Sequence, residues 1–345
     1  MTHLRIGKKI PPSFSLDVEF EIGPGVTALY GPAGAGKSVI LDALAGFVRP
    51  DSGRILREDV LLFDAQARVH VPPRRRACGY LSHRDALFPH LTVRQNLAFA
   101  ARGGRLERHR RINDMLERFH LAEIALRRPA GLDGPQKQRA ALARALMAAP
   151  QLLLLDDAEI SEPLFRQMRA EFAGPVLLAT RDLDRCCALA DRMLVLDAGR
   201  ILRRGTPEEI LDQPESVAVA RLLGIPNLFE ATIAGLDPGR NSSRLDLETT
   251  AGRHALAGPY FPGHFRGDRL SLAIRPERVR VHPAGSAEAA GAWSVPLVRT
   301  THRPSGVRLE FAGGVFADLS EEAYLRQKDN KGWLVEFPPE ALRVL

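Results

Sequence analysis

Residues 26–45 read VTALYGPAGAGKSVILDALA, a short apolar run, a glycine-rich loop and a second apolar run in direct succession. The loop has the spacing G-x-x-x-x-G-K-S, which is informative when a strand precedes it and a helix follows it. Glycines let backbone N–H groups converge on a phosphate, and the N-terminus of the following helix adds positive potential. We therefore predict a phosphate-binding loop between a strand and a helix. The alternative is a glycine-rich turn that carries a lysine by chance.

Two side chains of this loop carry the expected chemistry. Lys37 would reach the β- and γ-phosphates of a nucleotide, and the Ser38 hydroxyl would ligate Mg²⁺. The predicted nucleotide-binding residues are Gly31, Pro32, Ala33, Gly34, Ala35, Gly36, Lys37 and Ser38.

A second predicted strand ends in two carboxylates. Residues 152–155 read LLLL and are followed by Asp156 and Asp157. A carboxylate at the end of a buried strand beside such a loop is placed to hold Mg²⁺, so we assign Asp156 as a metal ligand together with Ser38. Asp157 would then serve as the general base for an attacking water. The alternative is a pair of solvated acidic residues that closes a strand.

Two patterns divide the chain. Up to about residue 225, short apolar strands alternate with helical stretches, which is typical of a mainly parallel sheet covered by helices. From Asn227 onward, apolar and polar residues alternate in short runs, as in LSLAI at 270–274, and Gly and Pro separate the runs. This period of two indicates a small antiparallel β domain. We predict two domains, 1–225 and 226–345.

Length, composition and charge exclude several classes of protein. A chain of 345 residues with 45% hydrophobic and 26% charged residues can build two or three cores. No apolar run approaches the roughly 18 residues of a membrane span, and no secretory signal is recognisable. The three cysteines have neither disulfide nor zinc spacing, which fits a cytoplasmic location. The net charge is +7, yet the basic residues are scattered without interleaved aromatic residues, so we expect no nucleic-acid partner.

Four segments of the chain resemble the nucleotide-binding subunit of an ABC importer. They span residues 26–55, 79–99, 131–157 and 176–210, and include LDALAGFVRPDSGRI and QKQRAALARALMAAPQLLLLDD in the family's order. The stretch PPRRRACGYLSHRDALFPHLTVRQNLAF is closest to the molybdate-type subunits. Further on, GDRLSLAIRPERVRV is similar to the appended TOBE domain of these importers.

This resemblance implies an α/β P-loop NTPase fold of the ABC ATPase type, with a helical subdomain at about 84–149, followed by an all-β, OB-like TOBE domain. It implies ATP and Mg²⁺ as cofactors, a membrane permease as partner, and a position peripheral to the inner face of the cell membrane. In this family two subunits enclose two ATP molecules, each bound by one subunit's loop and closed by the other's signature helix. Homodimer and heterodimer both remain open.

The chain departs from the family at residues that act on ATP. His83 stands at the place of a glutamine that contacts the γ-phosphate, Asp157 at that of a glutamate base, and Arg181 at that of a switch histidine. We keep these three as candidate catalytic residues. The shorter Asp157 carboxylate lies further back, and a misplacement of about 1 Å can cost on the order of 100-fold in rate. Arg181 can contact phosphate oxygens, and the alternative is a surface salt bridge.

The signature segment also differs, because residues 132–136 read LDGPQ. Asp133 and Gln136 match a D-x-x-Q capping pattern, and Pro135 is accepted in a first helical turn, so we predict that a helix begins here. Pro135 removes an N–H that would point at the partner's nucleotide, and Asp133 adds a negative charge there. Both changes oppose closure of a dimer over ATP.

Two further assignments rest on the resemblance. The family stacks adenine on an aromatic residue that precedes the loop, and Phe14 is the candidate, with a core phenylalanine as the alternative. Arg275, Glu277 and Arg278 match the family's arginine-proline-glutamate signature, which suggests oxyanion sensing or dimer contacts. Solvated strand ends are the alternative there.

The sequence thus predicts an ATP-binding subunit of an importer for molybdate, sulfate or a similar anion, with weakened ATP hydrolysis. The alternative is a catalytically degenerate regulatory or structural protein that binds a nucleotide or an oxyanion. The sequence leaves open whether the chain is an active ATPase.

Overall fold

The computed structural model describes residues 1–82, 87–158, 160–249, 252–284, 292–328 and 332–345. The chain divides into two compact units, Met1–Ile210 and Leu211–Leu345. The sequence instead predicts the first domain to continue to residue 225, so residues 211–225 are the segment on which the two divisions differ. None of the described helices has both the length and the apolar character that crossing a membrane requires.

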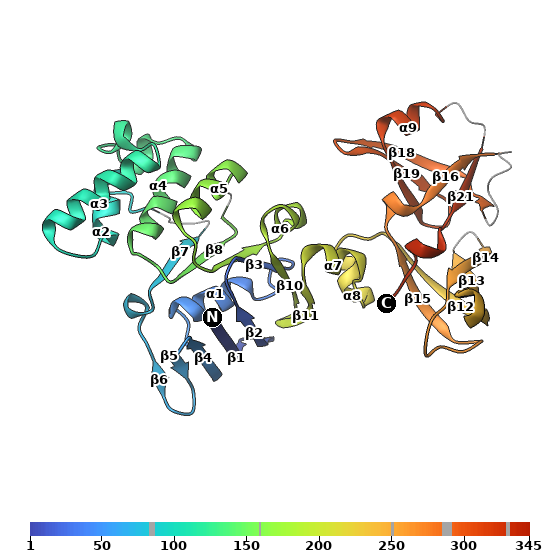
Figure 1. The fold of residues 1–345 in the computed structure, drawn as a ribbon, viewed down its shortest axis with the longest axis horizontal. Helices are drawn as coiled ribbons and strands as arrows, with labels where there is room; N and C mark the ends of the chain where they lie inside the picture. Colours follow the sequence, from blue (N-terminus) through green and yellow to red (C-terminus); the bar gives the residue numbers. More distant parts are fainter. Residues whose placement is uncertain (83–86, 159, 250–251, 285–291, 329–331) are drawn as a thin grey trace. The chain divides into compact units, whose positions relative to one another are not determined.

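A six-stranded sheet forms the centre of the first unit (Figure 1). Its first five strands are parallel, and β11 pairs antiparallel with β10 at the edge. Four consecutive buried leucines precede Asp156 in β8, and all five residues of β3 and of β9 are buried, as in a sheet covered on both faces. In spatial order the strands are β7 (Cys78–Ser82), β8 (Leu152–Asp156), β9 (Val176–Thr180), β3 (Val26–Tyr30), β10 (Arg192–Asp197) and β11 (Arg200–Gly205).

Helices of the first unit surround this sheet and extend beyond it. Among them, α2, α3 and α4 pack on one another and form the helical part between β7 and β8, where the sequence predicts a helical subdomain (Figure 1). The bounds are α1 (Lys37–Ala45), α2 (Val93–Ala100), α3 (Arg105–Arg118), α4 (Gly134–Met147), α5 (Glu162–Glu171) and α6 (Leu183–Leu189), and α7 (Pro207–Asp212) runs across the division of the chain after Ile210.

A second sheet in the first unit is entirely antiparallel, which the expectation of a mainly parallel sheet missed. In FSLDVEFEI at 14–22, Leu16, Val18, Phe20 and Ile22 are buried, and the residues between them are exposed. This alternation marks a half-buried strand, whereas in β3, β8 and β9 of the parallel sheet the buried residues follow one another without alternation. The strands in spatial order are β2 (Phe14–Ile22), β1 (Thr2–Ile10), β4 (Ser52–Arg57), β5 (Val60–Asp64) and β6 (Val69–His70).

A fully buried arginine holds the end of α1. The Arg76 guanidinium donates to the carbonyls of Ala43 at 2.6 Å and Leu44 at 3.1 Å, and to that of Val71 at 2.7 Å. The last carbonyls of a helix lack partners within it and attract a cation. Burial lowers the pKa of Arg76 to about 10. Arg76 therefore fastens the helix that follows the glycine-rich loop.

The second unit contains antiparallel sheets around its own apolar core, as the period-two pattern predicts. The largest has the strand order β14-β13-β12-β15-β22, and two three-stranded sheets have the orders β16-β21-β17 and β18-β19-β20. Its elements are α8 (Val217–Leu222), β12 (Asn227–Asp237), β13 (Ser242–Thr249), β14 (Gly252–Pro259), β15 (Arg269–Ile274), β16 (Arg280–Pro283), β17 (Trp293–Ser294), β18 (Leu297–Arg303), β19 (Gly306–Phe311), β20 (Val315–Leu319), α9 (Glu321–Leu325), β21 (Trp333–Glu336) and β22 (Arg343–Val344).

Candidate nucleotide site

A cleft of about 1460 Å³ lies at the carboxyl ends of β3, β8 and β9 in the first unit. Strands that run parallel end at the same edge of a sheet, so side chains far apart in the sequence meet there. Of the residues predicted for the site, the cleft is lined by Phe14, Ala33, Gly34, Gly36, Lys37, Ser38, Asp156, Asp157 and Arg181. The structure thus brings together predicted nucleotide, metal and catalytic residues.

The glycine-rich loop has the geometry that its glycines permit. Gly34 and Gly36 have φ angles of 79° and 106°, in the left-handed region that glycine adopts without strain. A Cβ atom on Gly31 would lie 2.1 Å from the Leu196 carbonyl oxygen, so a larger residue does not fit there. Space around Gly34 is open. The loop can therefore receive a ligand against its backbone.

Lys37 supplies the cation of this loop and is buried. Its Nζ atom donates to the carbonyl oxygens of Gly31 at 2.7 Å and Pro32 at 2.9 Å, which closes the loop around the ammonium. Burial lowers the pKa of Lys37, and the nearby Asp157 carboxylate opposes this shift. A buried cation at a helix N-terminus, beneath backbone N–H groups, fits a phosphate chain.

Oxygen atoms suited to Mg²⁺ lie next to this cation. The Ser38 hydroxyl donates to Asp156 Oδ1 at 3.0 Å, which joins the two residues predicted to hold the metal. The Tyr80 hydroxyl donates to Asp42 Oδ1 at 2.9 Å and approaches Asp156 Oδ2 at 3.3 Å. Burial raises the pKa of Tyr80 and of Asp42. A hydroxyl and a carboxylate are the hard ligands that Mg²⁺ prefers, so the donor set fits this ion.

Tyr80 contacts the predicted metal ligand Asp156 and the Asp42 carboxylate, and the sequence analysis did not predict either Tyr80 or Asp42. Tyr80 lies on β7, which pairs with β8, and Asp42 lies one turn beyond Ser38 on α1. The spacing of Asp42 from Ser38 is four residues, which places both on one face of a helix and was the available signal. No local pattern identifies Tyr80, because its contact depends on the pairing of two distant strands.

Asp157 and Arg181 form an ion pair at the edge of the cleft. Arg181 Nε lies 3.3 Å from Asp157 Oδ2, and the two side chains are 62% and 36% exposed. The Asp157 backbone has a φ of 46° and donates its N–H to the Ala179 carbonyl of β9. Arg181 precedes Asp182, whose side chain caps α6 by accepting from the Arg185 N–H. The base candidate is thus paired with the residue at the switch position.

The other predicted residues fall in different places. A Cβ atom on Gly36 would lie 2.8 Å from Phe14 Cζ, so the Phe14 ring lies against the loop and lines the cleft. Phe14 also packs against the core of the antiparallel sheet, so both interpretations of this residue stay possible. His83 lies outside the described residues.

The segment LDGPQ caps a helix as predicted. Asp133 Oδ1 accepts from the Gln136 N–H at 2.7 Å, and Gln136 Oε1 accepts from the Asp133 N–H at 3.1 Å. This reciprocal pair begins α4, with Pro135 in its first turn. Asp133, Gly134 and Pro135 are exposed, so the cap presents a carboxylate and no Pro135 N–H to the solvent.

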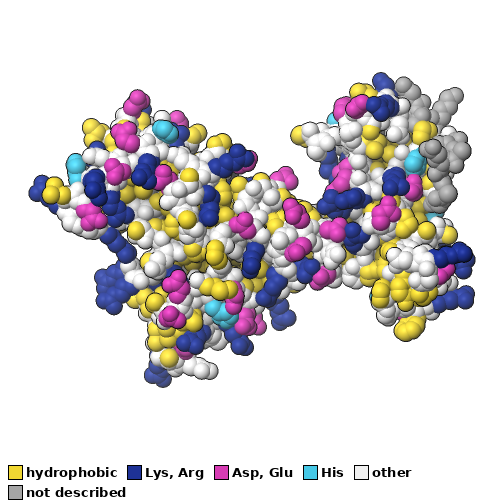
Figure 2. Space-filling model, in the orientation of Figure 1, with side chains coloured by type: hydrophobic (Ala, Val, Ile, Leu, Met, Phe, Trp, Pro, Cys, Tyr) yellow, Lys and Arg dark blue, Asp and Glu magenta, His cyan; other side chains and the backbone are white. Residues whose placement is uncertain are grey.

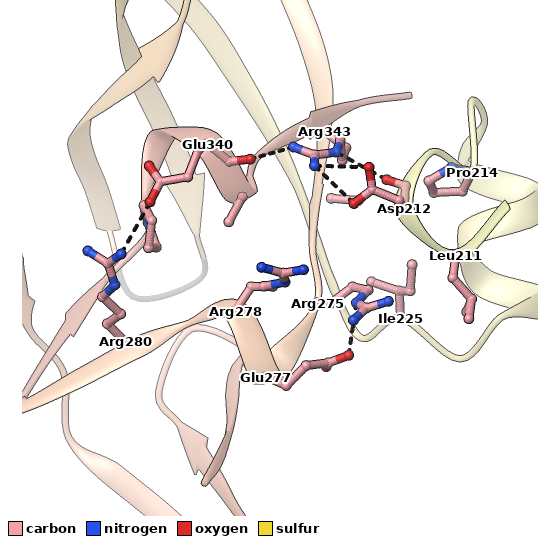
Figure 3. Close-up of a pocket in the computed structure, with 13 residues that line it drawn as sticks. Leu211, Asp212, Pro214, Ile225, Arg275, Glu277, Arg278, Arg280, Glu340 and Arg343 are labelled. Atoms are coloured by element: carbon pink, nitrogen blue, oxygen red, sulfur yellow. Dashed lines mark hydrogen bonds and ion pairs between the residues drawn. The ribbon is translucent and has the colours of Figure 1, made fainter. Parts of the chain in front are cut away.

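A second cavity, of about 260 Å³, lies in the second unit (Figure 3). Arg275 pairs with Glu277 at 2.8 Å, so two residues of the arginine-proline-glutamate motif bind each other. Arg343 pairs with Asp212 at 2.9 Å, and Arg280 pairs with Glu340 at 3.2 Å. Three of the four arginines that line this cavity are therefore already neutralised by carboxylates. The role suggested for this motif stays a prediction.

Known proteins are similar to this chain in sequence and in fold. The family model described as ABC transporter matches residues 16–159. The molybdenum import ATP-binding protein ModC of Rhodospirillum rubrum is 36% identical over 67% of this chain and 65% of its own length. The molybdate/tungstate import ATP-binding protein WtpC of Archaeoglobus fulgidus is 40% identical over 63% of this chain and 92% of its own length.

A polyamine importer subunit and a solved structure extend the comparison. The spermidine/putrescine import ATP-binding protein PotA of Vibrio cholerae is 34% identical over 83% of this chain and 75% of its own length. The structure of cbiO1 from Clostridium perfringens, part of an ABC transporter complex, aligns with a TM-score of 0.53 at 22% identity, over 64% of this chain and 94% of that one. The chain belongs to the family of ABC transporter ATP-binding proteins.

Proposed function

We propose that this chain is the ATP-binding subunit of an importer for molybdate or a similar oxyanion. It would bind Mg-ATP, pair with a second ATP-binding subunit and act on a membrane permease from the cytoplasmic face. The import relatives for molybdenum and for molybdate/tungstate support the class of solute. The relative named for spermidine/putrescine import also supports a role in import, but it points to a different class of solute.

The observation that carries the proposal is the joining of Lys37, Ser38 and Asp156 at one edge of the sheet. Lys37 lies beneath the loop, and Ser38 lies within hydrogen-bond distance of Asp156. Mg²⁺, when bound, would neutralise charge on the phosphates. Lys37 and the loop N–H groups would hold the phosphate chain, while Ser38 and Asp156 would orient the metal.

Hydrolysis is expected to be slower than binding. A general base needs a free carboxylate within reach of water, but Asp157 faces the Arg181 guanidinium. An incoming phosphate would compete for Arg181 and release Asp157. The Asp157 side chain would still be shorter than that of the glutamate which the family has at this position. The same ion pair and the Asp133 cap favour a second candidate function, a nucleotide-binding regulator that drives no transport.

Calorimetric titration of the purified chain with Mg-ATP tests the binding proposal. The Lys37→Ala variant removes the cation and is expected to weaken binding by at least about tenfold, as expected for a hydrogen-bonded charge worth about 1.5–3 kcal/mol. Lys328→Ala, an exposed lysine of the second unit, is the matched control. Binding that is equal in both variants would contradict the nucleotide site.

Reconstitution with a permease separates the two functions. ATP-dependent uptake of molybdate into vesicles, lost in Lys37→Ala, would support the importer. The permeases to test are those whose genes lie beside the gene of this chain. Intact Mg-ATP binding without uptake through any of them would favour the regulator.

A further inference from the structure

Six arginines gather where the turn at Pro73–Arg75 approaches the beginning of α3. The Arg102 guanidinium donates to the Arg74 carbonyl at 3.0 Å, which joins the two segments. Arg111 donates to the Arg102 carbonyl at 3.5 Å, and Arg108 donates to that of Ala98 at 3.1 Å. We call this set the basic patch, and Figure 2 shows dark-blue side chains crowding this margin of the first unit. Its members are Arg74, Arg75, Arg102, Arg105, Arg108 and Arg111.

The charge of the basic patch is not balanced locally. Within the described part of the chain, none of the six forms an ion pair with a carboxylate, whereas Arg118 and Arg166 of the same unit do. Glu107 is the acidic residue in the first turn of α3, and its carboxylate lies beside Gly103. All members except Arg111 are exposed, and Arg111 is half-buried. This surface therefore has a positive electrostatic potential.

Hydrogen bonds to backbone carbonyls explain Arg102, Arg108 and Arg111 in part, but stability does not account for the other three arginines. Arg105 and Arg108 lie in the first turns of α3, near the positive end of the helix dipole, where cations are unfavourable by about 0.3–1 kcal/mol each. Arg74, Arg75 and Arg105 make no side-chain hydrogen bond to the described residues. Local choices that oppose the fold point to a function.

Two protruding apolar side chains stand at the same corner. Phe99 follows Ala98, which accepts the hydrogen bond from Arg108, and Phe99 is 71% exposed. Leu106 follows Arg105 in the first turn of α3 and is 88% exposed. Guanidinium groups beside protruding apolar side chains are what an anionic bilayer surface accepts. A single-strand nucleic-acid binder would instead offer several exposed rings for stacking, whereas here Phe99 is exposed and its neighbour Phe88 is half-buried.

We infer that the basic patch docks on the anionic phospholipid headgroups of a membrane surface, with Phe99 and Leu106 reaching toward the acyl chains. The inference rests on the proposed function in that the permease would bring the chain to a membrane. Each arginine near an anionic surface contributes about 1 kcal/mol, and the attraction falls within a Debye length of about 8–10 Å. Binding should therefore weaken steeply as salt rises.

Sedimentation of the full chain with lipid vesicles tests this, without nucleotide or permease. Vesicles of phosphatidylcholine alone are compared with vesicles that also contain phosphatidylglycerol. The test variant is Arg74→Gln, Arg75→Gln, Arg105→Gln, and it keeps all the hydrogen bonds described above. The control, Arg200→Gln, Arg266→Gln, Arg269→Gln, removes equal charge from other exposed positions. Mg-ATP binding of both variants is measured to show that each is folded.

The wild-type chain and the control are expected to bind the anionic vesicles, and the test variant about 100-fold more weakly, from three arginines at about 1 kcal/mol each. Equal binding to both kinds of vesicle, or equal loss in test and control variants, would overturn the inference. So would absent vesicle binding together with patch-dependent binding of an RNA oligomer. Vesicle binding without Mg-ATP binding would retain this inference and reject the proposed function.

Discussion

In the function proposed above, Asp157 and Arg181 are the residues that limit ATP hydrolysis. The predicted phosphate loop and metal ligands are enough to bind a nucleotide, but hydrolysis also needs a carboxylate that reaches water. In the structure this carboxylate is short and paired with a guanidinium at 3.3 Å. Exposed ion pairs are worth about 0–1 kcal/mol, so a phosphate can separate the pair. We then expect the length of the Asp157 side chain to limit the rate of hydrolysis.

Lengthening this side chain should therefore increase turnover. We expect Asp157→Glu combined with Arg181→His to raise steady-state ATP hydrolysis on the order of 10–100-fold, because the base moves toward the water by about one C–C bond. The rate is measured by phosphate release. Adding Lys37→Ala to the same background should abolish the gain. An unchanged rate with Mg-ATP binding intact would show that Asp157 does not limit hydrolysis.

For Arg76 we predict an effect on the free energy of unfolding. Arg76→Ala would leave several buried carbonyls without a donor at the end of α1 and open a cavity, at a cost of about 3 kcal/mol or more. Urea unfolding measures this loss. Arg49→Ala, at an exposed position, should change stability by less than about 0.5 kcal/mol. A similar small change for both variants would contradict the capping role of Arg76.

At the scale of elements, two patterns predicted strands: continuous apolar runs in the first unit and alternation of apolar and polar residues in the second. The strand predicted from VTALY is β3, and the predicted run LLLL lies within β8, because buried residues follow one another in a strand that is covered on both faces. The antiparallel sheet was missed because helical periodicity and glycine loops dominated the pattern of the first unit. Tyr80 was missed because its contact with Asp156 arises only when β7 pairs with β8.

The beginning of α4 offers a test at this scale. Asp133→Ala removes the cap and should cost about 1 kcal/mol in unfolding free energy, while Asp133→Ser retains a capping oxygen and should cost much less. Asp133→Ser also removes the negative charge from the exposed cap. If this end of α4 closes over a partner's nucleotide, the Ser variant should dimerise more tightly with Mg-ATP. Sedimentation velocity measures the dimer, and identical behaviour of wild type and Asp133→Ser would exclude that contact.

At the scale of the whole molecule, each of the two units has its own hydrophobic core. Units with separate cores can unfold separately, so a single unfolding transition is not required. The described residues that line the nucleotide cleft all belong to the first unit. A ligand there stabilises the state that binds it and leaves other transitions in place.

Differential scanning calorimetry should therefore resolve two transitions. Saturating Mg-ATP is expected to raise the midpoint of the first unit's transition, with about 2.7 kcal/mol of added stability at a free ligand concentration 100 times Kd, and to leave the other unchanged. Lys37→Ala should lose this shift. A single transition that moves as a whole would show that the units unfold together.

The hydrogen bonds of Lys37 to Gly31 and Pro32 have a consequence for the speed of recognition. An ammonium already seated on the carbonyls of its own loop fixes the shape of that loop before a phosphate arrives. Little ordering entropy is then lost at the moment of capture, and preorganisation of this kind improves affinity without a new contact. The rate at which a nucleotide binds would then be governed by diffusion and charge. The slow steps of ATP turnover would follow binding.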